Sequence, residues 1–149
     1  MSNPFYSLYD YERLLKIMII EYRLVDNIQF CGSLDATGII NELHKSDVAV
    51  NPSLVESYSA AAAESLYIGV PTVLAYAGAM ANFSSQKQVA LYYNPLDYRS
   101  LASKIITLFE DGKERGRIIK NSLNIMPQFC CPDRVKERQL ETYSTVAGK

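Results

Sequence analysis

The sequence predicts an α/β fold in which a parallel sheet lies between two layers of helices. Helical and strand-like stretches alternate along the chain and are joined by connections of a few residues. The strand-like stretches are continuously apolar, which is typical of parallel strands that are buried on both faces. A chain of 149 residues without repeats or low-complexity linkers fits one domain, residues 1–149.

The helices are predicted from apolar residues that recur at helical spacing. In SLYDYERLLKIMIIEYRL this spacing joins Leu14, Leu15 and Met18, and Ser7 with Asp10 fits a capping box. The other helices are predicted in DATGIINELHKS, in the alanine-rich segment that ends before Gly69 and Pro71, in YRSLASKIITLFEDG, which Asp97 caps, and from Lys113 to Tyr143 with a break near 126–133.

Four short strands are predicted between these helices, in NIQFCG, DVAVNPS, PTVLAYAG and VALYYN. Doubly wound domains usually contain five or six parallel strands, and their ligands bind at the carboxyl ends of the central ones. Because the chain opens with a helix and offers only four strands, we interpret it as a Rossmann-like three-layer α/β/α domain that lacks its first strands.

Composition excludes several classes of protein. A net charge of −1 argues against a nucleic-acid partner that is held by a broad basic face. Cys31, Cys130 and Cys131 show neither metal-ligand nor disulfide spacing, which indicates a reduced, cytoplasmic setting and no metal site. The apolar stretch Leu14–Ile20 contains Lys16 and is too short to span a bilayer, and no signal peptide is recognised.

The segment VESYSAAAAES places Glu56 and Glu64 around a strand-to-helix turn, where ligands bind in parallel sheets. Ser57, Tyr58 and Ser59 are expected at the amino end of the helix, where free backbone N–H groups and the helix dipole favour an anion. Carboxylates also suit ligands that are rich in hydroxyl groups. The alternative is that Glu56 caps the helix and Glu64 is solvated, and spacing alone favours this alternative.

Other motifs carry less information. His44, the single histidine, ends a predicted helix and is interpreted as a residue that interacts with the helix dipole. No Ser-His-Asp or Cys-His arrangement can be assembled, and neither a GxGxxG loop nor a Walker sequence occurs. The loop AYAGAMAN, which contains Gly78, follows the third predicted strand and is placed to line a ligand crevice.

Three stretches resemble a known family when they are taken in order: FCGSL, SDVAVNPSLVESYSAAAAESLYIGVPTVLAYAG and ALYYNPLDYRSLASKI. Together they are similar to the carboxyl-terminal donor domain of the family-4 (group 1) retaining glycosyltransferases, which have the GT-B fold. The resemblance runs from about Leu8 to Tyr143. The positions that fall on the family pattern are Phe30, Gly32, Asp47, Pro52, Ser53, Glu56, Glu64, Gly69 and Pro71.

The resemblance implies roles for some of these positions and for the turn between them. Glu56 is expected to be the catalytic residue that contacts hydroxyls of the transferred sugar, and Glu64 is expected to bind the ribose of the nucleotide. The backbone amides from Ser57 to Ala60 would face the sugar or the diphosphate. The full donor-binding set that the resemblance implies is Gly32, Ser53, Glu56, Ser57, Tyr58, Ser59, Ala60 and Glu64.

The implied reaction is retaining transfer of a sugar from a nucleotide-sugar donor to a glycan or glycolipid acceptor, as in polysaccharide biosynthesis. No metal or other cofactor is expected, because the cationic side chains of Arg and Lys, together with helix-end amides, hold the diphosphate leaving group in this family. Two departures from the family pattern stand out. Glu56-Ser57-Tyr58-Ser59 replaces the usual Glu-Gly-Phe-Gly, and Ala77-Gly78-Ala79 replaces the usual Gly-Gly.

We also expect this chain to lack the family's first strands with their Arg and Lys, and the acceptor-binding amino-terminal domain. Such a fragment would be inactive alone, and the full-length enzyme would lie in the cytoplasm or at the membrane periphery. The strands at Ile28–Cys31 and Val48–Asn51 would then pair directly, or a second molecule would fill the gap between them as a homodimer. Two other functions remain open: a non-catalytic nucleotide-binding module and an α/β protein-interaction module.

Overall fold

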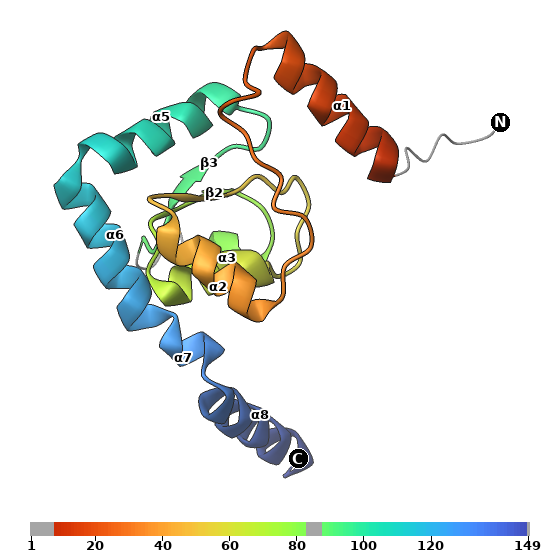
Figure 1. The fold of residues 1–149 in the computed structure, drawn as a ribbon. Coiled ribbons are helices and arrows are strands. Elements are labelled where there is room, and N and C mark those ends of the chain that lie inside the picture. Colours follow the sequence, from red (N-terminus) through yellow and green to blue (C-terminus); the bar gives the residue numbers. More distant parts are fainter. Residues whose placement is uncertain (1–7, 83–87, 149) are drawn as a thin grey trace. The chain divides into compact units, whose positions relative to one another are not determined.

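The computed structural model describes residues 8–82 and 88–148, in two units, Met1–Asp35 and Ala36–Lys149. In the first unit, helix α1 (Leu8–Glu21) forms where it is predicted and is followed by turns and irregular backbone (Figure 1). Ser7, which was predicted to take part in the capping box of this helix, lies outside the described residues.

The prediction of a strand in NIQFCG is wrong. Residues 28–31 form no strand, and the side chains of Ile28 and Phe30 are 43% and 49% exposed. A strand requires a hydrogen-bonded neighbour, and among the described residues no segment pairs with this one. The predicted direct pairing with the segment at Val48–Asn51 is therefore wrong too.

The sheet has three parallel strands in the order β1 (Ala49–Asn51), β2 (Thr72–Ala75) and β3 (Leu91–Tyr93). The register pairs Asn51 with Leu74 and Ala75 with Tyr93, so the three strands end at one edge of the sheet. In the described part of the chain β1 hydrogen-bonds to β2 alone. Its free edge is compatible with the predicted homodimer, which stays a prediction.

Helices cover both faces of the sheet, as the three-layer prediction requires. Alternate residues of β2 point to opposite faces: Leu74 packs into one cluster, whereas Val73 and Ala75 pack into the other. The first cluster contains residues of α3 (Ala60–Ile68), and the second contains residues of α5 (Tyr98–Glu110). Helix α6 (Gly112–Ile125) contributes to both clusters, through Ile125 and Ile118.

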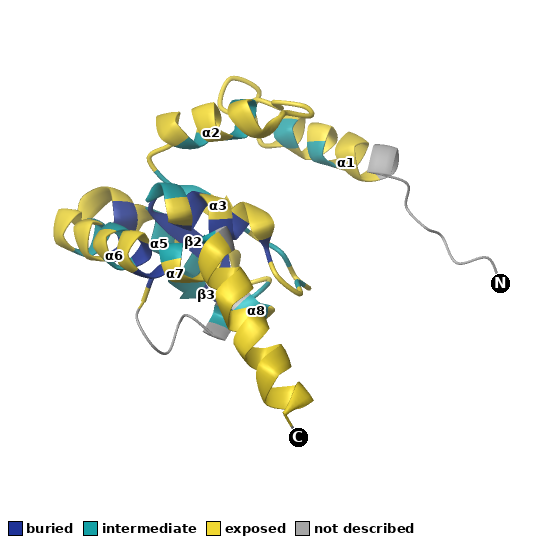
Figure 2. Cartoon of the chain, turned by 90° about the horizontal axis from the view of Figure 1, so that it is seen from below, coloured by how far each residue is buried: buried dark blue, intermediate teal, exposed yellow. Residues whose placement is uncertain are grey.

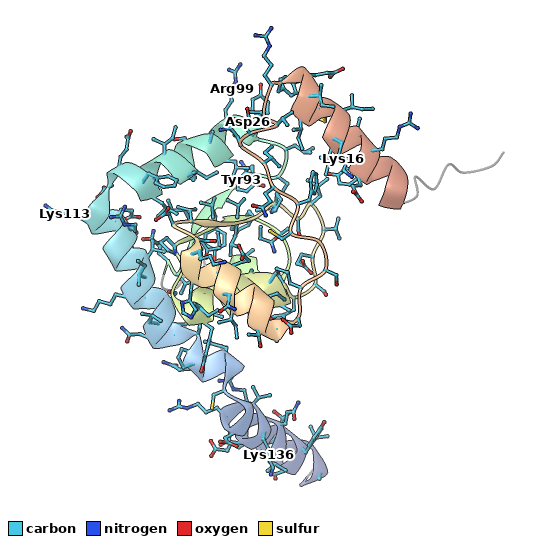
Figure 3. All side chains as sticks on the ribbon, in the orientation of Figure 1. Lys16, Asp26, Tyr93, Arg99, Lys113 and Lys136 are labelled. Atoms are coloured by element: carbon cyan, nitrogen blue, oxygen red, sulfur yellow. The ribbon has the colours of Figure 1, made fainter. Side chains whose placement is uncertain are left out.

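Burial is concentrated in these layers (Figure 2). The members of the first cluster are Ala62, Ala63, Leu66, Leu74, Val89, Ala90, Ile125 and Met126. The members of the second are Val73, Ala75, Tyr93, Leu108 and Ile118. Figure 3 shows Tyr93 among the strands and Lys113 projecting outward from α6.

The helix ends follow the predicted stop and start signals. Helix α3 ends before Gly69, which adopts a left-handed φ of 88° and donates its N–H to carbonyls of the last turn. The side chain of Asp97 caps α5 by accepting from the N–H of Ser100. The predicted break near 126–133 separates α6 from α8 (Pro132–Ala147), with the short α7 (Pro127–Cys130) between them. The remaining elements are α2 (Ala36–Lys45) and the 3-10 helix η1 (Ala79–Asn82).

Candidate functional site

Asn51 connects the strand-end turn to the start of α3. It is the last residue of β1, and its side-chain Nδ2 donates to Ser59 Oγ at 2.6 Å. Its Oδ1 accepts from the backbone N–H of Ser53 at 3.2 Å. Ser59 is the N-cap of α3 and accepts from the N–H of Ala62 at 3.2 Å. One chain of hydrogen bonds therefore fixes the turn and the amino end of the helix together.

Glu56 lies in this turn, before the helix. Its carboxylate Oε2 accepts a long hydrogen bond of 3.4 Å from Ser53 Oγ, and the residue is half-buried. Glu56 does not cap α3, because Ser59 does. The alternative in which Glu56 serves as the helix cap is therefore wrong, and the carboxylate is left at the carboxyl edge of the sheet.

Glu56 and Ser59 line the same small hollow. Its volume of about 10 Å³ is room for roughly one water-sized group. The hollow lies where β1, β2 and α3 meet, at the edge where the strands end. Its lining residues are Asn51, Ser53, Glu56, Ser59, Ala62, Leu74, Ala75 and Ala77.

The loop after β2 closes against the turn that carries Glu56. The N–H of Ala79 donates to the carbonyl of Ser57 at 2.9 Å. Gly78 has a φ of 64°, and a Cβ at this position would lie 2.1 Å from the carbonyl oxygen of Glu56. Only glycine permits so close an approach of the two backbones. The loop predicted to line a crevice is thus in contact with the backbone of the Glu56 turn.

Glu64 lies on a different hollow from Glu56. It is an exposed residue of α3 and borders a wider, largely apolar groove of about 710 Å³ between α2 and α3. Tyr58 and Ala60, both predicted site residues, line this groove as well. The groove is lined by Ala36, Ile39, Ile40, Leu43, Tyr58, Ala60, Ala63, Glu64, Tyr67 and Ile68.

The predicted site residues are therefore distributed over neighbouring parts of α3 and its preceding turn. Ser53, Glu56 and Ser59 meet at the small hollow, and Ser57 is held by the loop after β2. Tyr58, Ala60 and Glu64 border the groove. Gly32 belongs to the first unit, where it has a φ of 67° and open space around its Cα.

Two tyrosines flank the same edge of the sheet. Tyr76, directly after β2, is about half exposed and makes an edge-to-face contact with Tyr92, with 6.1 Å between the ring centroids. Burial, and to a lesser extent the neighbouring Tyr76, raise the pKa of Tyr92 well above its ordinary value. Burial also raises the pKa of Tyr93. The two phenols of β3 therefore stay protonated at neutral pH.

Neither the role of Asn51 nor the backbone contact of Gly78 was predicted from the sequence. The available signal for Asn51 was a polar amide at the carboxyl end of an apolar strand, directly before Pro52. For Gly78 no local signal exists, because the contact joins it to a distant part of the chain. His44 lies in the last turn of α2, as predicted, and is exposed.

The described part of the chain contains neither a cluster suited to a metal ion nor a helix that could cross a membrane. Residues 8–82 and 88–148 contain no group of three or more His, Cys, Asp or Glu side chains placed to hold a metal ion. Within the same ranges, every helix is too short or too polar to cross a bilayer. The expectation that no cofactor is needed stays a prediction.

Comparison with known sequences identifies a family. The model of the family described as glycosyl transferases group 1 matches residues 9–124. Two glycogen synthases of Mycobacterium tuberculosis, from strains CDC 1551 / Oshkosh and ATCC 25618 / H37Rv, are each 29% identical to this chain over 106 residues. The match covers 69% of this chain and 26% of each relative, so the chain spans about a quarter of the length of the curated relatives it matches.

Solved structures share the fold. Sucrose-phosphate synthase (tll1590) from Thermosynechococcus elongatus has a TM-score of 0.79 at 23% identity, covering 98% of this chain and 37% of that one. Anabaena Alr3699/HepE in complex with UDP-glucose has a TM-score of 0.84 at 23% identity, covering 94% and 38%. The carboxyl-terminal domain of the group 1 protein LpcC from Francisella tularensis has a TM-score of 0.71 at 21% identity, covering 86% and 65%. The predicted Rossmann-like, GT-B-type α/β fold is confirmed.

Proposed function

The chain belongs to the group 1 glycosyl transferases, and on that premise we propose that its strand-end site binds a nucleotide-sugar donor for retaining transfer to a glycan or glycolipid acceptor. The observation that carries the proposal is the position of Glu56. Its half-buried carboxylate is held by Ser53 at the carboxyl edge of a parallel sheet, beside the amino end of α3. Ligands of open α/β sheets bind at this edge.

The amino end of α3 suits the diphosphate of such a donor. The first N–H groups of a helix have no partner within the helix, and the helix dipole places partial positive charge there. The side chain of Ser59 accepts a hydrogen bond from the N–H of Ala62, and the amides from Ser57 to Ala60 belong to the same turn. We assign these amides to the diphosphate, and Glu56 to hydroxyls of the transferred sugar.

Glu64 suits the ribose. Its exposed carboxylate can accept two hydrogen bonds from a vicinal diol, and it borders a groove whose other walls are largely apolar. In this arrangement Glu56 and Glu64 hold opposite ends of one extended ligand. Glu56 does so at the small hollow and Glu64 at the groove, and both sites border α3. Alr3699/HepE, which shares the fold, was solved in complex with UDP and with UDP-glucose, so these are suitable first probes.

Transfer itself requires positive charge at the leaving group. Among the described residues, neither hollow is lined by Lys or Arg. Cations that stabilise the departing diphosphate contribute strongly to catalysis. We therefore propose that this chain binds the donor by itself, and that turnover requires the cationic and acceptor-binding parts of a complete glycosyltransferase.

Titration of UDP, GDP and ADP by isothermal calorimetry tests the assignment. We expect the parent protein to bind at least one of them and Glu64→Ala to weaken that binding about tenfold or more, because hydrogen bonds to a charged group contribute about 1.5–3 kcal/mol. Glu137→Ala is the matched control, since Glu137 is also an exposed glutamate within a helix, α8. If Glu64→Ala binds like the parent, the assignment is wrong.

Turnover of a labelled nucleotide-sugar by the same samples separates this function from its alternatives. We expect nucleotide binding without turnover by the chain alone. Turnover by the chain alone would show that it carries sufficient catalytic groups itself. A protein that binds none of the three nucleotides would instead favour an α/β protein-interaction module.

A further inference from the structure

The orientation of the Asn51 amide is fixed by its neighbours. The backbone N–H of Ser53 can only donate, so the side-chain atom of Asn51 that it contacts at 3.2 Å is the carbonyl oxygen. The amide NH₂ therefore faces Ser59 Oγ, at 2.6 Å, and donates to it. The alternative placement of the amide, with O and N exchanged, would set the NH₂ against the N–H of Ser53.

This orientation determines what the Ser59 hydroxyl can do. A hydroxyl has two acceptor sites and one proton to donate. Ser59 Oγ accepts from Asn51 Nδ2 and from the N–H of Ala62, at 2.6 Å and 3.2 Å. Among the described residues these are the two hydrogen bonds of this oxygen, so its proton remains as a donor. Ser59 is 5% exposed and lines the small hollow.

The same hollow offers an acceptor. Glu56 lines it, and its carboxylate receives the long 3.4 Å bond from Ser53 Oγ. A group that accepts from Ser59 and donates to Glu56 must be both acceptor and donor, which describes a hydroxyl. The volume of about 10 Å³ is suited to one group of that size.

We propose that the hollow receives one hydroxyl of the transferred sugar, which accepts from Ser59 Oγ and donates to Glu56, and that Asn51 is the positioning residue that sets this polarity. The inference rests on the proposed donor site and adds a specificity-determining residue to it. A site that hydrogen-bonds a substrate hydroxyl discriminates against a ligand that lacks it, because the polar groups of the site are then left unpaired.

The test uses Ser59→Gly in the full chain. Glycine is itself a good N-cap residue, so α3 keeps an acceptable start while the change removes the hydroxyl. Urea unfolding checks that the variant remains folded without the bond from Asn51. The measured quantity is the sugar preference, defined as the Kd of a nucleotide diphosphate divided by the Kd of its sugar conjugate. The probe pairs are UDP with UDP-glucose, ADP with ADP-glucose and GDP with GDP-mannose.

We expect Ser59→Gly to lower the sugar preference of the best pair about three- to tenfold, the usual range for one neutral hydrogen bond. Both ligands of a pair share the diphosphate, so any effect of the substitution on the amides that face it cancels from this ratio. Monodeoxy analogues of the best conjugate identify the hydroxyl. The analogue that lacks it should lose more than this factor on the parent, because it gives up the bonds to both Ser59 and Glu56. It should lose less on Ser59→Gly, where only the bond to Glu56 remains to be removed.

Asn51→Asp tests the direction of the hydrogen bond between residue 51 and Ser59. The carboxylate still accepts from the N–H of Ser53, but it also accepts the Ser59 proton and so withdraws the donor from the hollow. We expect a loss of sugar preference similar to that in Ser59→Gly, and no additional loss when the two are combined. Asp111→Gly controls for helix capping, because it removes the side-chain cap of α6, which accepts from the N–H groups of Lys113 and Glu114.

Two results would overturn this inference: an unchanged sugar preference in Ser59→Gly, which includes an equal loss for nucleotide and sugar conjugate, or a parent protein without any sugar preference. Each of them leaves the nucleotide site intact, provided that Glu64→Ala still weakens nucleotide binding. Failure of the proposed function is recognised separately, by the absence of nucleotide binding or by Glu64→Ala binding like the parent.

Discussion

At the scale of the single residue, Gly78 shows how the candidate site is held in place. It combines a left-handed φ of 64° with an approach to the Glu56 carbonyl that leaves no room for a Cβ. The adjacent N–H of Ala79 then reaches the carbonyl of Ser57. Gly78 therefore occupies the position where the two backbones meet.

We expect Gly78→Ala to destabilise the fold and weaken the binding of sugar nucleotides. The left-handed conformation alone costs about 1–2 kcal/mol for a residue with a Cβ, and the steric overlap must also displace the loop. Urea unfolding measures the free energy, and calorimetry measures the Kd. Gly116→Ala is the control: Gly116 lies in α6 with open space around its Cα, so the change should stabilise by about 0.5–1 kcal/mol. Equal stability of Gly78→Ala and the parent would contradict the steric argument.

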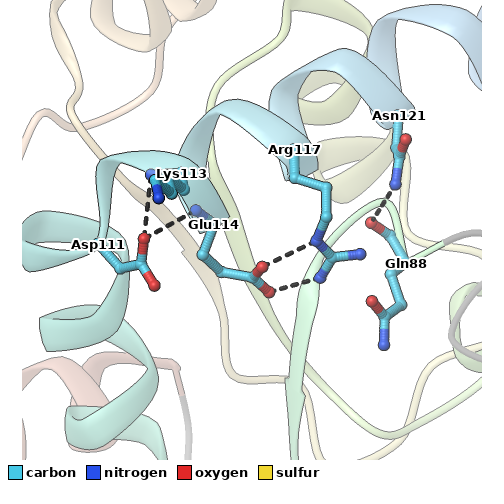
Figure 4. Close-up of polar contacts among 6 residues, drawn as sticks. All are labelled: Gln88, Asp111, Lys113, Glu114, Arg117 and Asn121. Atoms are coloured by element: carbon cyan, nitrogen blue, oxygen red, sulfur yellow. Dashed lines mark hydrogen bonds and ion pairs between the residues drawn. The ribbon is translucent and has the colours of Figure 1, made fainter.

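Among the elements, α6 contributes side chains to both buried clusters. Side-chain hydrogen bonds fix the start of this helix (Figure 4). Asp111 accepts from the N–H groups of Lys113 and Glu114 at 3.0 Å and 2.9 Å. One turn on, the guanidinium of Arg117 donates to both carboxylate oxygens of Glu114, at 2.8 Å and 2.5 Å. The hydrogen bond from Arg117 is the main cause that lowers the pKa of Glu114 below its ordinary value of 4.5.

This pair predicts a small pH dependence of stability. A lowered pKa in the folded state means that the contribution is complete above the unfolded-state pKa and is lost as the pH falls through the folded-state value. Because the pair is partly exposed, we expect only about 0.2–0.5 kcal/mol. Urea unfolding of the parent and Glu114→Gln should differ by this amount near neutral pH and converge in acid, once the pH has fallen below the lowered folded-state pKa of Glu114. A difference that persists unchanged in acid would assign it to something other than the ion pair.

At the scale of the whole molecule, burial is unequally divided. Every side chain that the structure describes as buried belongs to the second unit, whereas those described in the first unit are exposed or intermediate. Helix α1 has 14 residues, and isolated helices of this length are marginal in water. The second unit instead has the two clusters that enclose β2.

Native-state hydrogen exchange should report this division. We expect the amides of α1 to exchange through local opening of low free energy, and those of β2 to exchange only through global unfolding, because β2 is buried on both faces. Exchange followed by NMR or mass spectrometry at neutral pH measures both elements in one sample. Protection of α1 equal to that of β2 would show that α1 is stabilised by packing beyond its own helix.

Features that depend on neighbours along the chain could be predicted from the sequence. The α/β class, the helix stop at Gly69, the Asp97 cap and the break after α6 follow from periodicity and capping chemistry, which act within a few residues. The family and the location of a site at the start of α3 were predicted from ordered motifs. Tertiary structure decided what requires partners from elsewhere: residues 28–31 form no strand without a neighbour, and Gly78 meets Glu56 only once β2 has paired. The polarity of the Ser59 hydroxyl likewise depends on Asn51, because a hydrogen bond acquires its direction only when both partners are in place.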